Sequence, residues 1–229
     1  MELVDFDPGA EAKILAALVY PATDAPLPRL QEWAAGLDAA ERERIFRQLG
    51  DLRGNRRHKP PRALEMVYYT FDLLGDFGIY RDLHRHRLMT QVRQTLSTRL
   101  GHVVPEELAE TGLEERFGEM MARAAELHEA VAPDFPAEAQ YLVPMAFRIR
   151  WLVRLNLREL MWLVELRSTP QGHPAYRAMA QGMYRKVLAV QPALAGLMRF
   201  VDLADYPLGR MGAEQRQEEK KPRDRSSAP

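Results

Sequence analysis

The sequence predicts an α+β fold in which a small, mostly antiparallel sheet packs against helices. Two segments, residues 67–73 and 145–155, alternate between apolar and polar side chains, which is the period of a half-buried strand. Elsewhere, apolar residues recur every three or four positions, as in amphipathic helices. Strands that bury one face need other elements to cover it, so we expect helices to complete the core.

The N-terminal part is predicted to be helical. Residues 10–20 carry apolar side chains at helical spacing, and prolines enclose the turn that follows. Asp38 and Glu41 have the spacing of a capping box, which predicts the start of a second helix. Gly50 or Gly54 stops that helix.

The middle of the chain combines the first strand with further helices. A basic loop over residues 55–61, broken by two prolines, precedes the strand. After the strand, one helix begins near Ile79 and another covers residues 114–131. A short helical segment over residues 138–142 is predicted to precede the second strand.

The second strand leads directly into a helix, and this junction organises the chain. Asn156 breaks the alternation and can cap a helix that runs to Arg167. A strand that feeds a helix leaves free backbone N–H groups, which suit anions. Arg150 on the strand, Arg158 in the first helical turn and Arg167 in the last could face one pocket. An alternative of about equal weight is that the arginines of the strand simply face water.

Two more amphipathic helices are predicted near the C-terminus, over residues 176–190 and 193–201. Hydrophobic residues then become scarce, and residues 209–229 are predicted to be a disordered, charged tail. We therefore expect a single domain over residues 1–208.

Composition and charge exclude several classes of protein. The chain has 229 residues, no cysteine and a formal net charge of zero. The lack of cysteine excludes disulfides, thiolate metal sites and a cysteine nucleophile, and no metal site is expected. No apolar run approaches the length of a membrane span, and the N-terminus lacks the basic region of a secretory signal. We therefore expect a cytoplasmic protein with no membrane partner.

A dense basic cluster follows the first predicted strand. It comprises Arg81, His84, Arg85, His86, Arg87, Arg93 and Arg99. A solvated face, a nucleic-acid patch and a site for nucleotide phosphates would each explain it. A nucleic-acid patch usually occurs in a net basic domain with interleaved aromatic residues. Because this chain is neutral overall, the cluster favours the nucleotide site, and no nucleic-acid partner is expected.

The residues around the strand–helix junction resemble a known family. Pro144, Arg150, Asn156, Arg158, Leu160, Met161, Leu166 and Arg167 match, without a gap, the C-terminal signature of the flavin-dependent thymidylate synthases. The tripeptide Arg85-His86-Arg87 supplies the second signature of that family, and the resemblance covers roughly residues 41–202. The lack of cysteine separates the chain from the classical thymidylate synthases, which attack their substrate with a thiol.

The resemblance implies a fold, a reaction and an assembly. The fold would be that of the flavin-dependent thymidylate synthases, assembled as a homotetramer with flavin sites between subunits. The reaction would be the reductive methylation of dUMP to dTMP. FAD would be the cofactor, and methylenetetrahydrofolate and NADPH would be the co-substrates.

The resemblance also implies roles for individual residues. The flavin would be held by Arg85, His86, Arg87, Asn156 and Arg158, with His58 approaching it from the basic loop. The nucleotide phosphate would be held by Ser97, Arg99 and Arg150. Arg167 would contact the uracil ring and stabilise its N3 anion, because a guanidinium stays charged and donates hydrogen bonds.

The chain departs from the family pattern in several places. After Arg87 the glycine, the tyrosine and the acidic residue of the family are missing, and a two-residue insertion best aligns Ser97 and Arg99. Met66 replaces a histidine, and Trp162 stands where the family has a polar residue near the flavin. A diverged flavin- and nucleotide-binding relative, with altered or no synthase activity, is therefore an alternative. A nucleic-acid-binding module is a further one.

Overall fold

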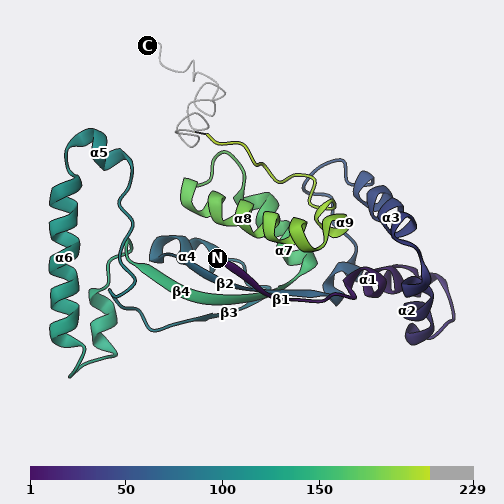
Figure 1. Cartoon of the computed structure of the whole chain (residues 1–229), viewed down its shortest axis with the longest axis horizontal. Helices are drawn as coiled ribbons and strands as arrows, with labels where there is room; N and C mark the ends of the chain where they lie inside the picture. The colour runs from purple at the N-terminus through teal and green to yellow at the C-terminus, as the bar shows by residue number, and fades with distance from the viewer. Residues whose placement is uncertain (207–229) are drawn as a thin grey trace, which may run out of the picture. The chain divides into compact units, whose positions relative to one another are not determined.

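The computed structural model describes residues 1–206 as a four-stranded sheet with helices (Figure 1). The strands are β1 (Glu2–Phe6), β2 (Tyr68–Asp76), β3 (Met89–Arg93) and β4 (Arg148–Asn156). The α-helices are α1 (Ala10–Val19), α2 (Leu27–Gly36), α3 (Ala39–Asp51), α4 (Phe77–Leu83), α5 (Glu107–Thr111), α6 (Glu114–Val131), α7 (Leu157–Arg167), α8 (Pro174–Val190) and α9 (Pro192–Ala195). Three 3-10 helices are η1 (Tyr20–Ala22), η2 (Arg62–Met66) and η3 (Glu138–Leu142). The prediction of an α+β fold is confirmed, and the predicted tail lies outside the described residues.

The chain forms two compact units, each made of two separate segments. The sheet unit comprises Met1–Asp7 and Tyr68–Asn156, and the helical unit comprises Pro8–Val67 and the chain from Leu157 onward. The strand–helix junction after Asn156 is therefore also a passage from one unit to the other. A single domain over residues 1–208 stays a prediction.

The sheet is antiparallel throughout, with the strand order β1-β2-β4-β3. The long central pair, β2 and β4, runs in register from Tyr68 opposite Asn156 to Asp76 opposite Arg148. Both edge strands are short, and the sequence patterns did not predict them. The second strand also begins later than predicted, because Phe147 N–H closes a turn onto Pro144 O at 3.1 Å before β4 starts.

Alternation along the central strands builds the core of the sheet unit. Its buried side chains are Tyr69, Phe71 and Leu73 from β2, and Ile149, Trp151, Val153 and Leu155 from β4. Tyr80 of α4 packs edge-on against Trp151, with ring centroids 5.5 Å apart. The arginines of β4 occupy the opposite face, as the period of two requires.

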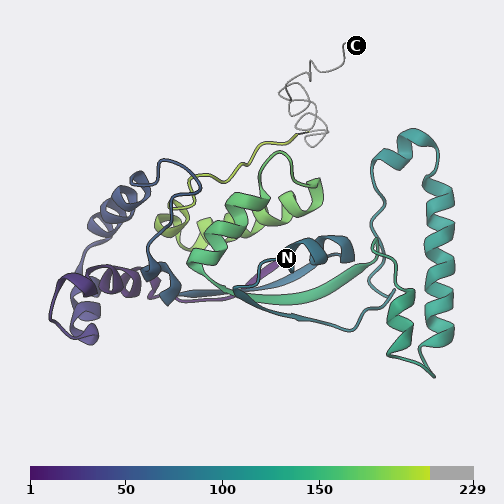
Figure 2. The same ribbon diagram turned by 180° about the vertical axis from the view of Figure 1, so that it is seen from behind.

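In the helical unit, α7 is the most enclosed helix. Seven of its eleven residues are buried, and it packs against α8 and η2 (Figure 2). Around it, α1 packs on α2, and α9 packs on α8 and α3. The predicted cap of α3 is confirmed, because Asp38 Oδ1 accepts a hydrogen bond from Glu41 N–H at 2.8 Å. Within residues 1–206, no helix is both long and apolar enough to cross a membrane.

Candidate functional site

The sheet unit contains a pocket of about 480 Å³ where β3 ends and β4 begins. It is lined by Arg93, Gln94, Thr95, Ser97, Arg99, Leu100, Arg148 and Ile149. The lining contributes three guanidinium groups, two hydroxyl groups and no carboxylate. Within residues 1–206, no acidic side chain forms an ion pair with these three arginines. The pocket is therefore cationic and suited to an anion with several oxygens.

The backbone after β3 shapes this pocket because β4 holds it at both ends. Gln94 N–H donates to Arg150 O at 3.0 Å, and Arg148 N–H donates to Gly101 O at 2.8 Å. Gly101 has a φ of +69°, a left-handed conformation that side chains rarely adopt. The six residues between these two attachments, 95–100, form the loop that carries Ser97 and Arg99.

Gln140 of η3 holds the loop from a third side. Its Oε1 atom accepts hydrogen bonds from Leu96 N–H at 3.1 Å and from Arg93 Nη1 at 3.2 Å. Arg93 Nη1 also donates to Gln94 O at 3.1 Å. One amide oxygen therefore fixes both the backbone beside Ser97 and the direction of a guanidinium in the lining.

The structure brings together two of the three residues that were assigned to the nucleotide phosphate. Ser97 and Arg99 both line the pocket. Arg150 does not line it and instead pairs with Asp72 on the neighbouring strand, at 3.1 Å between Nη1 and Oδ1. The sequence assigned no role to Arg148, which lines the pocket two residues earlier on β4. Alternation of polar residues along β4 was the available signal, but it cannot tell one arginine from the next.

The Arg85-His86-Arg87 motif follows α4 instead of forming its last turn. His84 caps that helix, so the motif begins at the residue directly after the cap. His86 is buried, and its backbone N–H donates a hydrogen bond to Leu83 O at 3.0 Å. Arg85 and Arg87 are exposed on either side, and Arg85 lies 3.6 Å from Asp82. Two exposed guanidinium groups around a buried anchor fit a diphosphate ligand.

Three predicted site residues belong to the helical unit. Arg158 of α7 donates to Pro60 O at 3.1 Å and to Glu65 Oε1 at 2.7 Å. Hydrogen bonding from Arg62, supported by Arg158, holds the pKa of Glu65 below its usual value. The guanidinium of Arg167 lies over the ring of Tyr176, 5.2 Å from its centroid.

His58, the third, is exposed in the basic loop. Its Nδ1 atom accepts a hydrogen bond from Gly54 N–H at 3.2 Å, and its Nε2 atom lies 2.8 Å from Asn55 Nδ2. These local contacts fix the orientation of the ring. Within residues 1–206, no group of three or more His, Asp or Glu side chains could hold a metal ion.

Comparison with known sequences identifies related proteins. The family model described as thymidylate synthase complementing protein matches residues 2–193. A UPF0159 protein of Chlamydia pneumoniae is 43% identical over 218 residues, which is 95% of this chain and 41% of that protein. Thermoplasma acidophilum has another, 40% identical over 209 residues and covering 89% and 41% of the two chains. This chain thus spans about two fifths of the length of these curated relatives.

Comparison with solved structures identifies a related fold. A UMP/dUMP methylase, PolB from Streptomyces cacaoi, was crystallised with 5-Br dUMP and superposes with a TM-score of 0.64. The match covers 87% of this chain and 94% of that one, at 19% sequence identity. The two chains therefore share a fold.

Proposed function

Because the chain belongs to the thymidylate synthase complementing protein family, we propose that it takes part in the reductive methylation of dUMP to dTMP. The observation that carries this proposal is the cationic pocket of the sheet unit, with its three guanidinium and two hydroxyl groups. The related methylase is described with a brominated dUMP, which agrees with a uracil nucleotide as the ligand.

The pocket suits the phosphate end of the nucleotide. A phosphate monoester carries close to two negative charges at neutral pH and offers three acceptor oxygens. Arg99 and Arg148 can donate paired N–H groups to those oxygens, and Ser97 can add a hydroxyl donor. Because the lining has no carboxylate, no fixed negative charge competes with the phosphate.

For the cofactor we propose FAD, bound through its diphosphate by Arg85 and Arg87. Their exposed guanidinium groups fit two adjacent phosphates, while the buried His86 anchors the turn between them. Methylenetetrahydrofolate would donate the one-carbon group. The flavin, itself reduced by NADPH, would supply the hydride that reduces this group to a methyl group. Asn156, Arg158 and His58 are proposed as further flavin contacts, and Arg167 as the contact to the uracil ring.

Calorimetric titration of dUMP tests the pocket. Arg99→Ala should weaken dUMP binding by roughly ten- to a hundred-fold, because a hydrogen bond to a charged group contributes about 1.5–3 kcal/mol. The matched control is Arg154→Ala, since this exposed guanidinium on β4 stacks over Tyr68 and does not line the pocket. Equal losses in the two variants would contradict the assignment.

A second candidate function is favoured by the departures of this pocket from the family pattern. The glycine, the tyrosine and the acidic residue that the family has after its Arg-His-Arg motif are missing here, and the lining carries three guanidinium groups and no carboxylate. We therefore keep the alternative of a diverged protein that binds flavin and nucleotide without synthase activity. Expression in a thymidine-requiring strain separates the two, because only a competent synthase restores growth without thymidine.

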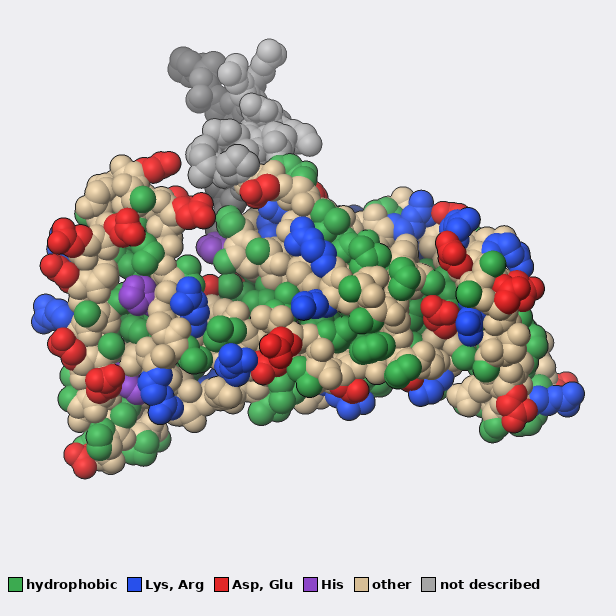
Figure 3. Space-filling view, in the orientation of Figure 1, with side chains coloured by type: hydrophobic (Ala, Val, Ile, Leu, Met, Phe, Trp, Pro, Cys, Tyr) green, Lys and Arg blue, Asp and Glu red, His purple; other side chains and the backbone are tan. Residues whose placement is uncertain are grey.

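A nucleic-acid-binding module has less support. Figure 3 shows acidic and basic side chains interspersed over the visible face, instead of a broad surface of one sign. Binding to nucleic acid through phosphates would weaken steeply with added salt and would need no flavin.

A further inference from the structure

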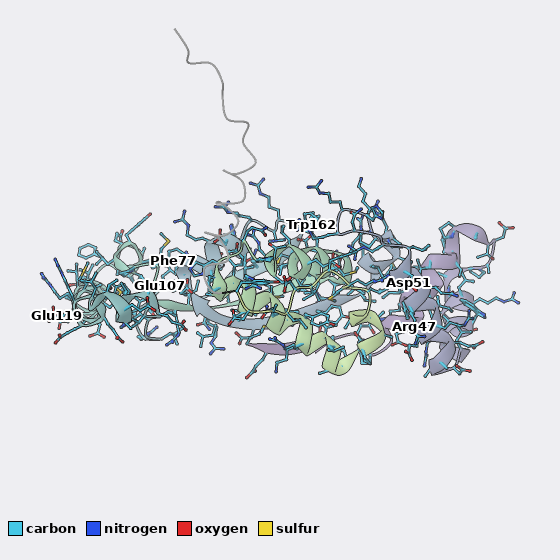
Figure 4. The ribbon with its side chains drawn as sticks, turned by 90° about the horizontal axis from the view of Figure 1, so that it is seen from above. Arg47, Asp51, Phe77, Glu107, Glu119 and Trp162 are labelled. Atoms are coloured by element: carbon cyan, nitrogen blue, oxygen red, sulfur yellow. The ribbon has the colours of Figure 1, made fainter. Side chains whose placement is uncertain are left out.

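Trp162 is an exposed side chain on α7, the most enclosed helix within residues 1–206. All eleven residues of α7 are described, and Trp162 is the one among them that is exposed, at 43% (labelled in Figure 4). A large aromatic side chain that remains exposed on an otherwise covered helix offers apolar area and a flat π-face to a ligand.

The basic loop lies against this indole. The guanidinium of Arg56 is stacked over the Trp162 ring, with its central carbon 5.6 Å from the ring centroid. The Nη1 atom of Arg56 is buried and has no hydrogen-bond partner within residues 1–206. The stacking on Trp162 is therefore the contact that fixes this end of the Arg56 side chain.

An ion pair holds one end of this loop. Arg53 and Glu165 of α7 form two hydrogen bonds, at 2.8 and 2.7 Å, and their side chains are only 7% and 0% exposed. The same guanidinium donates to the carbonyl oxygens of Arg56 at 3.3 Å and His58 at 3.2 Å. Both the stacked arginine and the exposed histidine are therefore positioned through their backbone by Arg53.

A second arginine holds the other end of the loop. Arg158 binds Pro60 O and the carboxylate of Glu65. From Arg53 to Pro60, the chain thus contacts three residues of α7 in turn. Arg53 pairs with Glu165, Arg56 stacks on Trp162, and Pro60 accepts a hydrogen bond from Arg158. These three helix positions are separated by three and four residues and share one face of α7. The loop therefore runs antiparallel to the helix and is anchored on both sides of Trp162.

We propose that Trp162 and Arg56 form a preorganised stacking platform for the fused heteroaromatic ring of an anionic ligand. The indole and the guanidinium present flat surfaces, and Arg57, His58 and Lys59 stand exposed in the same loop and attract negative charge. Anchoring on both sides lowers the entropy lost when the ligand binds. The inference rests on the proposed function, which supplies two ligands of this class: FAD, whose isoalloxazine carries a diphosphate chain, and folate, whose pteridine is linked to the carboxylates of a glutamate tail.

Titration of four compounds into the full chain tests the platform. FAD and riboflavin report the flavin ring with and without its charged chain, folic acid reports the pteridine, and dUMP reports the pocket of the sheet unit. Trp162→Leu should weaken at least one fused-ring ligand by about tenfold or more, as expected for losing a ring-stacking contact. The same variant should leave dUMP affinity within about twofold. Loss of flavin affinity alone assigns the platform to FAD, and loss of folic acid affinity alone assigns it to the pteridine.

The matched control is Trp33→Leu, because Trp33 is another exposed tryptophan of the helical unit, on α2. The platform is overturned if wild type binds no fused-ring compound, if Trp162→Leu binds all of them as wild type does, or if Trp33→Leu weakens them as much as Trp162→Leu. It is also overturned if Trp162→Leu weakens dUMP as much as it weakens the fused rings. The titration of dUMP into wild type tests the proposed nucleotide function separately. A negative result for the platform therefore does not affect the test of dUMP binding, and the reverse also holds.

Discussion

At the scale of single residues, Gln140 shows how a neutral side chain can organise a charged pocket. Its amide oxygen receives Leu96 N–H and Arg93 Nη1 at once. Carbonyl oxygens have two lone pairs and can serve both donors without adding charge. A carboxylate in the same place would pair with Arg93 and neutralise part of the attraction for an anion.

We expect Gln140→Leu to weaken dUMP binding by about two- to tenfold, because the loop and the guanidinium both lose an acceptor and a net hydrogen bond contributes about 0.5–1.5 kcal/mol. Gln140→Glu should weaken it at least as much, through the competing charge. Calorimetry measures both variants. Gln48→Leu is the control, since Gln48 is exposed on α3 and lines no part of the pocket. Unchanged affinity in both Gln140 variants would show that the loop keeps its shape without this contact.

At the scale of elements, the buried ion pair between Arg53 and Glu165 holds the basic loop against α7. Removing one partner of a buried ion pair leaves the other charge without compensation, which typically costs about 3–5 kcal/mol. Glu165→Ala should therefore lower the free energy of unfolding strongly and release the loop. Arg53→Met combined with Glu165→Leu should cost less than Glu165→Ala, because no buried charge remains.

Urea unfolding measures the stability of these variants, and trypsin measures the loop directly. Cleavage after Arg56 or Arg57 should be slow in wild type and fast in Glu165→Ala. Asp51→Ala is the control, because its ion pair with Arg199 is far more exposed and should contribute only about 0–1 kcal/mol. Equal losses of stability for Asp51→Ala and Glu165→Ala would mean that burial does not determine how much the pair of Arg53 and Glu165 contributes to the free energy of unfolding.

At the scale of the whole molecule, the sheet leaves apolar side chains exposed on the face that carries the arginines. Val92 and Leu152 stand opposite one another on β3 and β4, and they are 55% and 40% exposed. A cross-strand apolar pair that stays exposed offers a contact for a second copy of the chain. We propose that this face is buried in the homotetramer that the family resemblance implies.

Sedimentation velocity tests the assembly. We expect a species of about four times the chain mass of 26.3 kDa, and Leu152→Asp should shift it to smaller species by placing a charge in the interface. Leu188→Asp, an exposed position on α8, is the matched control. A monomeric wild type, or a Leu152→Asp protein that keeps the wild-type mass, would contradict the proposal.

Much of the local structure could be predicted from the sequence, because short-range patterns encode it. The period of two along β4 identified its buried and exposed faces, and Asp38 marked the start of α3. Asn156 marked the passage from β4 into α7. Strands β1 and β3 escaped detection, since each has five residues and lies at an edge where both faces stay partly exposed. Without a buried face, a strand shows no clear alternation.

By itself, the sequence determined the fold class, the two long strands and most of the helices. The family resemblance assigned Ser97 and Arg99 to one site, and both line the cationic pocket. Only the tertiary structure decided which arginines share that site. Arg148 entered the lining while Arg150 turned to Asp72, although both lie on one face of β4. Likewise, Gln140 reaches a loop 44 residues away, and Arg53 finds Glu165 across 112 residues. Periodicity reports which face a residue takes, whereas register and packing between distant segments determine what it meets there.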